Sequence, residues 1–253
     1  ELGLMHFYKR RYKESKKLYV EVDKLLNESN EVDEKTKFLH YYRYGVLQNN
    51  TNHPSLAEKL FEKSFEYADT NFYKGNAIMN IGISFVRRKK YRKAIEYYRK
   101  ALGIFDDDLS RSILFNNLAE IYRSLEEYDK ALYYIKLAFS CTDDENLSDM
   151  FVCYQTYAQI LMCKDEVGEA IKKLMELINK AENKFVYKKF IMAGINIIKE
   201  YVLKTKSINI LEDMEELIYQ SVNNASSHDK EYIKELKSYI ELNMIYKKYL
   251  NPD

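Results

Sequence analysis

The chain has 253 residues, and its 40 basic and 39 acidic side chains leave a net charge of +1. This balance argues against binding nucleic acid or membranes over the whole surface, since such proteins carry a marked basic excess. Only 7 glycines and 2 prolines occur, against 46% hydrophobic residues, which indicates helices joined by short polar turns.

The cysteines and the hydropathy pattern place further limits. Cys141, Cys153 and Cys163 are odd in number and form no CxxC pair, so we expect free thiols in a reducing, cytoplasmic compartment. No apolar run approaches the ~20 residues that span a bilayer. No secretory signal peptide is visible.

The first predicted elements lie in residues 1–30 and in a unit over about 36–70. Gly3, Tyr12, Ser15 and Tyr19 form a partial repeat, and its open start predicts a fragment of a longer protein with a segment missing before Glu1. The next unit carries Tyr44-Gly45, then a strong turn signal in Asn49–Pro54, then Ala57-Glu58-Lys59-Leu60-Phe61.

The clearest units follow, over about 74–106 and 111–143. Each places a small residue on a first helix, Gly82 or Ala119, and alanines seven apart on a second helix. These small residues allow two helices to approach closely, and overfilling such a seam costs roughly 1–3 kcal/mol. The paired alanines are Ala94 with Ala101 and Ala131 with Ala138. We expect the rings of Phe85, Tyr98 and Tyr122 to fill the space that the small residues leave.

The pattern continues to the end of the chain. A unit over about 148–182 is followed by a degenerate unit over about 185–222 and an amphipathic helix over about 229–250, expected to cap the stack. The small residues Gly45, Gly82, Ala119 and Ala158 recur at intervals of 37, 37 and 39. We therefore predict one all-α domain over 1–253, a right-handed superhelical solenoid of helical hairpins.

These units resemble tetratricopeptide repeats. The long period and the composition rich in lysine, asparagine and tyrosine resemble more closely the sensor domains of Gram-positive peptide-pheromone regulators, the Rap, NprR and PlcR group with the arbitrium receptors. That resemblance implies a repeat domain that binds a short secreted peptide, attached to an N-terminal module. No helix-turn-helix is readable in this chain, so DNA would be contacted only through such a further module.

In such a stack the first helices line the concave groove, and their groove-facing places are rich in amides. Asparagine and glutamine carry both a donor and an acceptor, so they can pair with the backbone of an extended peptide. An arginine can hold a peptide carboxylate with two hydrogen bonds. The predicted peptide-binding residues are Tyr42, Asn76, Asn80, Arg87, Asn116, Asn117, Glu120, Arg123, Gln155 and Gln159.

Simpler interpretations apply to several of these residues. Asn80 and Asn117 occupy a place where asparagine also serves packing between repeats. Glu120 and Arg123 form an i,i+3 pair that can be an ordinary surface contact. The basic run Arg87–Lys93 spans a hairpin turn and favours a solvated or partner-facing surface over a nucleic-acid site.

No catalytic motif, metal-ligand spacing or cofactor loop is present. We therefore predict a peptide-binding sensor domain of a quorum-sensing-type transcription regulator, with no cofactor and no catalysis. The alternative is a general protein–protein adaptor of the same repeat class. The tyrosine-rich second helices (Tyr97, Tyr98, Tyr133, Tyr134) are either a homodimer contact or hairpin core.

Overall fold

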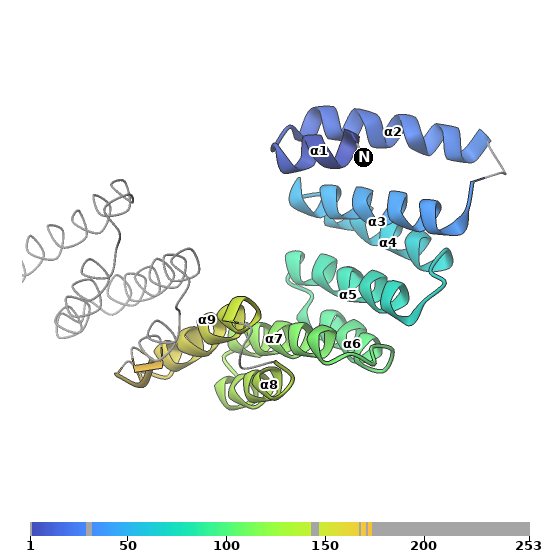
Figure 1. Cartoon of the computed structure of the whole chain (residues 1–253). Coiled ribbons are helices and arrows are strands. Elements are labelled where there is room, and N and C mark those ends of the chain that lie inside the picture. Colours follow the sequence, from blue (N-terminus) through green and yellow to red (C-terminus); the bar gives the residue numbers. More distant parts are fainter. Residues whose placement is uncertain (1, 29–31, 143–146, 167, 171, 174–253) are drawn as a thin grey trace, which may run out of the picture. The chain divides into compact units, whose positions relative to one another are not determined.

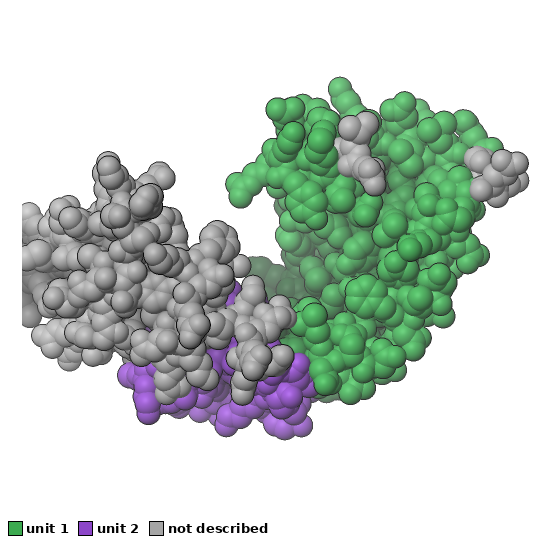
Figure 2. All heavy atoms as spheres, in the orientation of Figure 1, with its two compact units in different colours: residues 1–121 green, residues 122–253 purple. Residues whose placement is uncertain are grey.

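The computed structural model describes residues 2–28, 32–142, 147–166, 168–170 and 172–173 (Figure 1). The described residues are helical and contain no strand, which confirms the all-α prediction. The chain divides into two compact units, residues 1–121 and 122–253, each considered by itself (Figure 2). The predicted unit over 185–222 and the capping helix over 229–250 lie outside the described residues, as does most of the second helix of the unit over 148–182.

Unit 1 consists of successive helical hairpins in which α1 packs on α2, α3 on α4 and α5 on α6, with α4 also packing on α5. Its helices are α1 (Leu2–Tyr8), α2 (Tyr12–Glu28), α3 (Glu34–Asn50), α4 (Pro54–Glu66), α5 (Asn71–Arg87) and α6 (Tyr91–Leu102). A further helix, α7 (Asp108–Ser124), begins in unit 1 and ends in unit 2. In unit 2, α8 (Tyr128–Ser140) packs on α9 (Leu147–Cys163).

Side-chain caps set where the first helices begin. The Asp33 carboxylate accepts a hydrogen bond from the Thr36 amide at 2.9 Å, and Thr70 Oγ1 accepts one from the Tyr73 amide at 3.2 Å. Asp107 does the same for Ser110 at 2.7 Å. Because these caps satisfy free N–H groups of the first turn, α5 and α7 begin about three residues before the sequence-based bounds at 74 and 111.

A glycine facing an aromatic ring forms the seam of each hairpin in unit 1. A Cβ added to Gly45 would lie 2.7 Å from the Phe61 ring, and one added to Gly82 only 2.4 Å from the Tyr98 ring. Tyr98 is 2% exposed and Phe61 is fully buried. The predicted close approach at Gly82 is therefore confirmed, and Tyr98 belongs to the hairpin core rather than to a dimer contact.

The turn after each first helix has a repeated backbone geometry. The second residue beyond the helix has a positive φ, and in the described residues these are Arg10, Asn52, Lys89, Glu126 and Asp165, with φ between 56° and 66°. In the α5–α6 turn, the Lys90 amide donates to the Phe85 carbonyl at 2.9 Å. This six-to-one hydrogen bond around a left-handed residue is the Schellman motif, which usually places glycine there.

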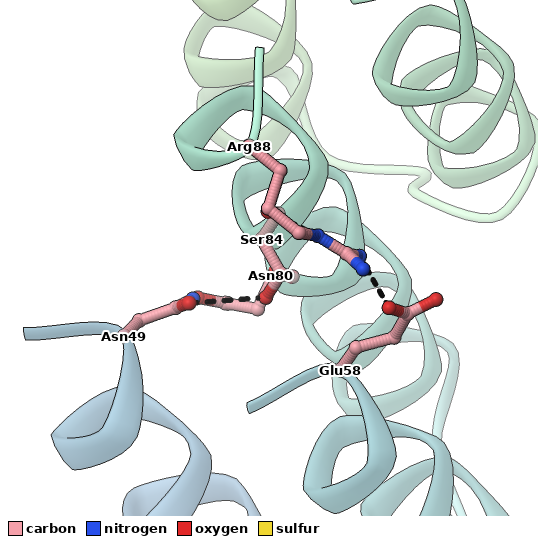
Figure 3. Close-up of polar contacts among 5 residues, drawn as sticks. All are labelled: Asn49, Glu58, Asn80, Ser84 and Arg88. Carbon is pink, nitrogen blue, oxygen red and sulfur yellow. Dashed lines mark hydrogen bonds and ion pairs between the residues drawn. The ribbon is translucent and has the colours of Figure 1, made fainter. Parts of the chain in front are cut away.

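Polar contacts also tie the α3–α4 hairpin to α5 (Figure 3). The Arg88 guanidinium forms an ion pair with Glu58 and lies 4.4 Å from the Phe85 ring centroid. The Ser84 hydroxyl donates to the Asn49 side-chain oxygen at 3.2 Å and to the carbonyl of Asn80. Part of the basic run is thus engaged in contacts within unit 1.

A buried histidine couples α2 to α3. His40 Nε2 lies 3.6 Å from the Asp23 carboxylate, and His40 itself is only 7% exposed. Burial lowers the pKa of His40, although the Asp23 charge works in the opposite direction. Burial together with the negative charge of Asp23 raises the pKa of the neighbouring Tyr41 to about 12.

Candidate functional site

A pocket of about 370 Å³ opens between α1, α3 and α5 of unit 1. Most of its wall is aromatic, with rings from all three helices, and its polar lining consists of Arg43 and Asn76. The rings are Phe7, Tyr8, Phe38, Tyr42, Phe72 and Tyr73. An apolar pocket with a few convergent polar groups is the usual form of a ligand site.

The rings hold one another in place across the helices. Phe38, which is 2% exposed, stacks on Tyr42 of its own helix at 5.4 Å and on Tyr73 of α5 at 4.4 Å between centroids. Phe72 is 55% exposed and Tyr8 is 75% exposed, so both offer a large apolar surface to solvent. The pocket therefore combines a packed floor with an apolar rim that a ligand can cover.

A chain of hydrogen bonds runs beside these rings. Asn80 Nδ2 donates to the Tyr42 hydroxyl at 3.0 Å and to the backbone carbonyl of Asn76 at 2.9 Å. Asn76 Nδ2 donates to the Phe72 carbonyl at 2.7 Å. Within the described part of the chain, neither asparagine has a hydrogen bond to its side-chain oxygen, so both oxygens remain acceptors. Burial raises the pKa of Tyr42, opposed by the hydrogen bond from Asn80, so its hydroxyl stays protonated at neutral pH.

Arg43 is the positively charged residue in the lining of this pocket. It is half-buried and lines both this pocket and an adjoining one of about 410 Å³, which it shares with Lys9. No aspartate or glutamate lines either pocket, and no ion pair of Arg43 is found among residues 2–28 and 32–142. The site is thus electropositive and able to take an anionic group.

The structure brings three of the predicted site residues together and separates their roles. Tyr42 and Asn76 line the pocket, whereas Asn80 is 8% exposed and ties α5 to Tyr42 of α3. The side-chain nitrogen of Asn80 therefore contributes to packing between α3 and α5, while its oxygen accepts no hydrogen bond within the described residues. Arg87 is exposed at the end of α5 and does not line the pocket.

The remaining predicted residues lie on α7 and α9. Asn116 is 6% exposed, and its side-chain oxygen is buried without a hydrogen bond in the described structure. Asn117 and Glu120, also in unit 1, are half-buried. The half-buried residues Arg123, Gln155 and Gln159 belong to unit 2.

Sequence reasoning missed most of the aromatic wall and the cation. Phe72 and Tyr73 precede the expected start of their unit at 74, and Phe38 was not assigned to the groove. The repeat interval of 37 was a usable signal for Arg43, because it places Arg43 in register with Asn80 and Asn117. Arg43 thus carries a positive charge at the place where the two following units carry an asparagine, and this difference could have indicated a ligand contact.

Other kinds of site find no support in the described residues. No group of three or more His, Cys, Asp or Glu side chains there is placed to hold a metal ion. In the same part of the chain, no helix is long and apolar enough to cross a membrane. The cysteines described there are free thiols.

Comparisons with known proteins agree with this architecture. The sequence profile of the tetratricopeptide repeat family matches residues 73–142. No curated protein sequence matches the chain significantly.

Solved structures of similar fold cover nearly the whole chain. The apo quorum sensor NprR from B. thuringiensis is 16% identical, with a TM-score of 0.65, covering 96% of this chain and 74% of NprR. Apo RapI is 15% identical, with a TM-score of 0.64 and 98% and 96% coverage. The Rap conjugation regulator of plasmid pLS20, solved with the Phr* peptide, is 16% identical, with a TM-score of 0.63 and 99% and 75% coverage.

At these identities the likeness establishes the fold, and the family profile establishes the repeat type of the central hairpins. Residues 73–142 match the tetratricopeptide repeat family, and the chain shares the helical solenoid fold of the NprR and Rap structures.

Proposed function

We propose that this chain is the peptide-binding sensor domain of a quorum-sensing-type transcription regulator. The observation that carries the proposal is the face shared by α3 and α5, where a preorganised aromatic pocket adjoins amide acceptors and an arginine without an ion pair in the described structure. The fold likeness to NprR and to a Rap regulator solved with a peptide supports a peptide as the ligand. The chain performs no catalysis in this proposal.

The chemistry of the face suits an extended peptide. The side-chain oxygens of Asn76 and Asn80 can accept hydrogen bonds from peptide N–H groups, which gives affinity that depends little on peptide sequence. The pocket rings then select one large side chain. Because the Tyr42–Asn80 hydrogen bond joins two hairpins, a peptide that contacts either residue also acts on the packing between α3 and α5.

The proposed ligand contacts retain the residues that the sequence indicates. In unit 1 they are Tyr42, Asn76, Asn80, Arg87, Asn116, Asn117 and Glu120, joined by the pocket residues Arg43, Phe72 and Tyr73. Arg123, Gln155 and Gln159 of unit 2 remain sequence-based predictions.

The test is affinity capture with a matched pair of variants. The chain is immobilised, the small-peptide fraction of the native host's conditioned medium and lysate is passed over it, and retained peptides are identified by mass spectrometry. Asn76→Ala removes a pocket amide, whereas Asn50→Ala removes an exposed amide outside the pocket. Both side chains donate only to a carbonyl of their own helix, Asn50 to Val46 at 2.9 Å, so both losses should affect folding equally little.

One enriched short peptide that is lost with Asn76→Ala and kept with Asn50→Ala would establish the sensor function and identify its ligand. Equal retention by both variants would contradict the proposed site. Whole proteins retained in place of any short peptide would instead favour a general adaptor, which the breadth of the repeat class keeps as the second candidate.

A further inference from the structure

The aromatic pocket is small relative to a whole peptide ligand. Its volume of about 370 Å³ lies near the lower end of the roughly 300–1,000 Å³ found for small-molecule sites. It can enclose one large side chain, and the stacked rings of Phe38, Tyr42 and Tyr73 are already held in position. A preorganised pocket of this kind loses little side-chain entropy when a ligand enters.

The charge beside the pocket is the second observation. Arg43 lines this pocket and the next, Lys9 lines the second, and neither pocket has an acidic residue in its lining. Two other arginines of unit 1 differ in this respect, since Arg88 pairs with Glu58 and Arg111 donates to the Phe105 carbonyl at 3.1 Å. A half-buried guanidinium without an ion pair in the described structure is well suited to bind a carboxylate with two hydrogen bonds.

The repeat register shows that the two following units do not carry an arginine at this place. Asn80 and Asn117 occupy the place equivalent to Arg43 at intervals of 37 residues. An amide there reaches a neighbouring hairpin, as Asn80 does through the Tyr42 hydroxyl. The arginine therefore departs from the repeat pattern beside a pocket whose aromatic rim, Tyr8 and Phe72, is exposed.

On these grounds we propose that the pocket binds the C-terminal residue of a short peptide, with a large apolar side chain among the rings and its free carboxylate on Arg43. This proposal rests on the peptide-binding function above and specifies one end of its ligand. A C-terminal residue carries both groups on one Cα. In an extended peptide, by contrast, the side chain of a neighbouring acidic residue points to the opposite face.

The experiment uses the full chain and synthetic random heptapeptide mixtures, each mixture fixed at its last residue. Mixtures ending in Phe, Leu, Ile or Met should be retained above those ending in Gly, Ser or Lys. The best single peptide is then measured as free acid and as C-terminal amide by fluorescence polarisation. Amidation should weaken binding by about ten- to a hundredfold, since hydrogen bonds to charged groups contribute roughly 1.5–3 kcal/mol.

Variants assign that effect to Arg43. Arg43→Gln should bring the free acid to the affinity of the amide and leave the amide unchanged, and Arg43→Lys should lie between, because lysine keeps the charge without the planar fork. Arg92→Gln, an exposed arginine on α6, is the matched control and should retain the acid preference. Circular dichroism of each variant verifies folding, and the lysine variant serves if the glutamine variant is unstable.

The outcomes separate this inference from the general function. Peptides that bind with the same acid-to-amide ratio in wild type and Arg43→Gln would overturn the C-terminal anchor and leave a peptide-binding domain. Dependence on Arg43 for an amidated peptide with an internal aspartate would overturn it in favour of a side-chain carboxylate. Absence of binding by every mixture would refute the proposed function and the anchor together.

Discussion

The glycine–ring seam makes a quantitative prediction for Gly82→Ala. The new Cβ would lie 2.4 Å from Tyr98 Cε1, whereas carbon atoms in contact are about 3.5–4.0 Å apart, so the ring or the helix must move by more than an ångström. Tyr98 is 2% exposed, so the ring cannot move away from the new Cβ without displacing its own neighbours or reaching solvent. Such overpacking costs about 1–3 kcal/mol, and alanine recovers about 1 kcal/mol of helix propensity. The difference of these two terms is a net loss of up to about 2 kcal/mol in the free energy of unfolding, and the close approach at Gly82 favours the upper part of that range.

Thermal unfolding followed by circular dichroism measures this loss, at about 2–4 °C per kcal/mol for a chain of this size. The control is Gly103→Ala at the end of α6, where the nearest heavy atom would be 3.5 Å from the new Cβ and φ is −75°. We expect that change to stay within about 0.5 kcal/mol. Equal melting temperatures for the two variants would refute the seam.

A second variant tests whether the ring is the cause. Ala119 and Ile135 occupy the places of Gly82 and Tyr98 in the next hairpin pattern, again sixteen residues apart, and both are fully buried. In the sequence pattern, alanine in place of glycine is thus accompanied by isoleucine in place of tyrosine sixteen residues later. The double variant Gly82→Ala with Tyr98→Ile should therefore be more stable than the sum of the single changes, by about 0.5–3 kcal/mol. Strict additivity would show that the two positions do not share one space.

Three further predictions concern buried groups of unit 1. Ala94→Leu should lower stability by about 1–3 kcal/mol because Ala94 is fully buried, whereas Arg92→Leu on the same helix should change little, as compared by melting temperature. The raised pKa of Tyr41 means that its stabilising contribution is complete below pH 10.0 and is lost as the pH rises to about 12, so Tyr41→Phe should lessen the alkaline loss in urea unfolding. The lowered pKa of His40 means that stability is complete above pH 6.5 and falls on acidification, because the unfolded chain takes up the proton first. His40→Gln should flatten that acid limb, and an unchanged slope would contradict the assignment.

The fold could be predicted because a few residue types at fixed spacings determine how the helices of each hairpin pack. Gly45 and Gly82 recur at the repeat interval, and each faces a ring that itself lies at a fixed distance further on in the sequence. Such contacts are local, so the amino-acid pattern alone determines them. The helix starts were less accurate, because the cap residues Thr70 and Asp107 act through side-chain hydrogen bonds that the repeat pattern does not contain.

The candidate site was predicted less completely. Tyr42 and Asn76 were found because the repeat register assigns them to the inner helices. Asn80 was predicted both as a ligand contact and as a packing residue, and only the coordinates show that its side-chain nitrogen donates to the Tyr42 hydroxyl. Phe72 escaped notice because the pocket depends on how α1, α3 and α5 approach one another, and no single repeat encodes that arrangement.

The left-handed turns have a practical consequence for anyone who wishes to engineer this domain. Lys89 and Glu126 have a left-handed backbone conformation, which costs a residue with a Cβ about 1–2 kcal/mol. Glycine would remove that cost, but its greater freedom in the unfolded chain would cancel about 0.5–1 kcal/mol of the gain. Neither residue lines the aromatic pocket. Substituting glycine at these two positions should therefore raise the free energy of unfolding. A glycine-substituted background would tolerate destabilising changes in the pocket and allow its specificity to be redesigned.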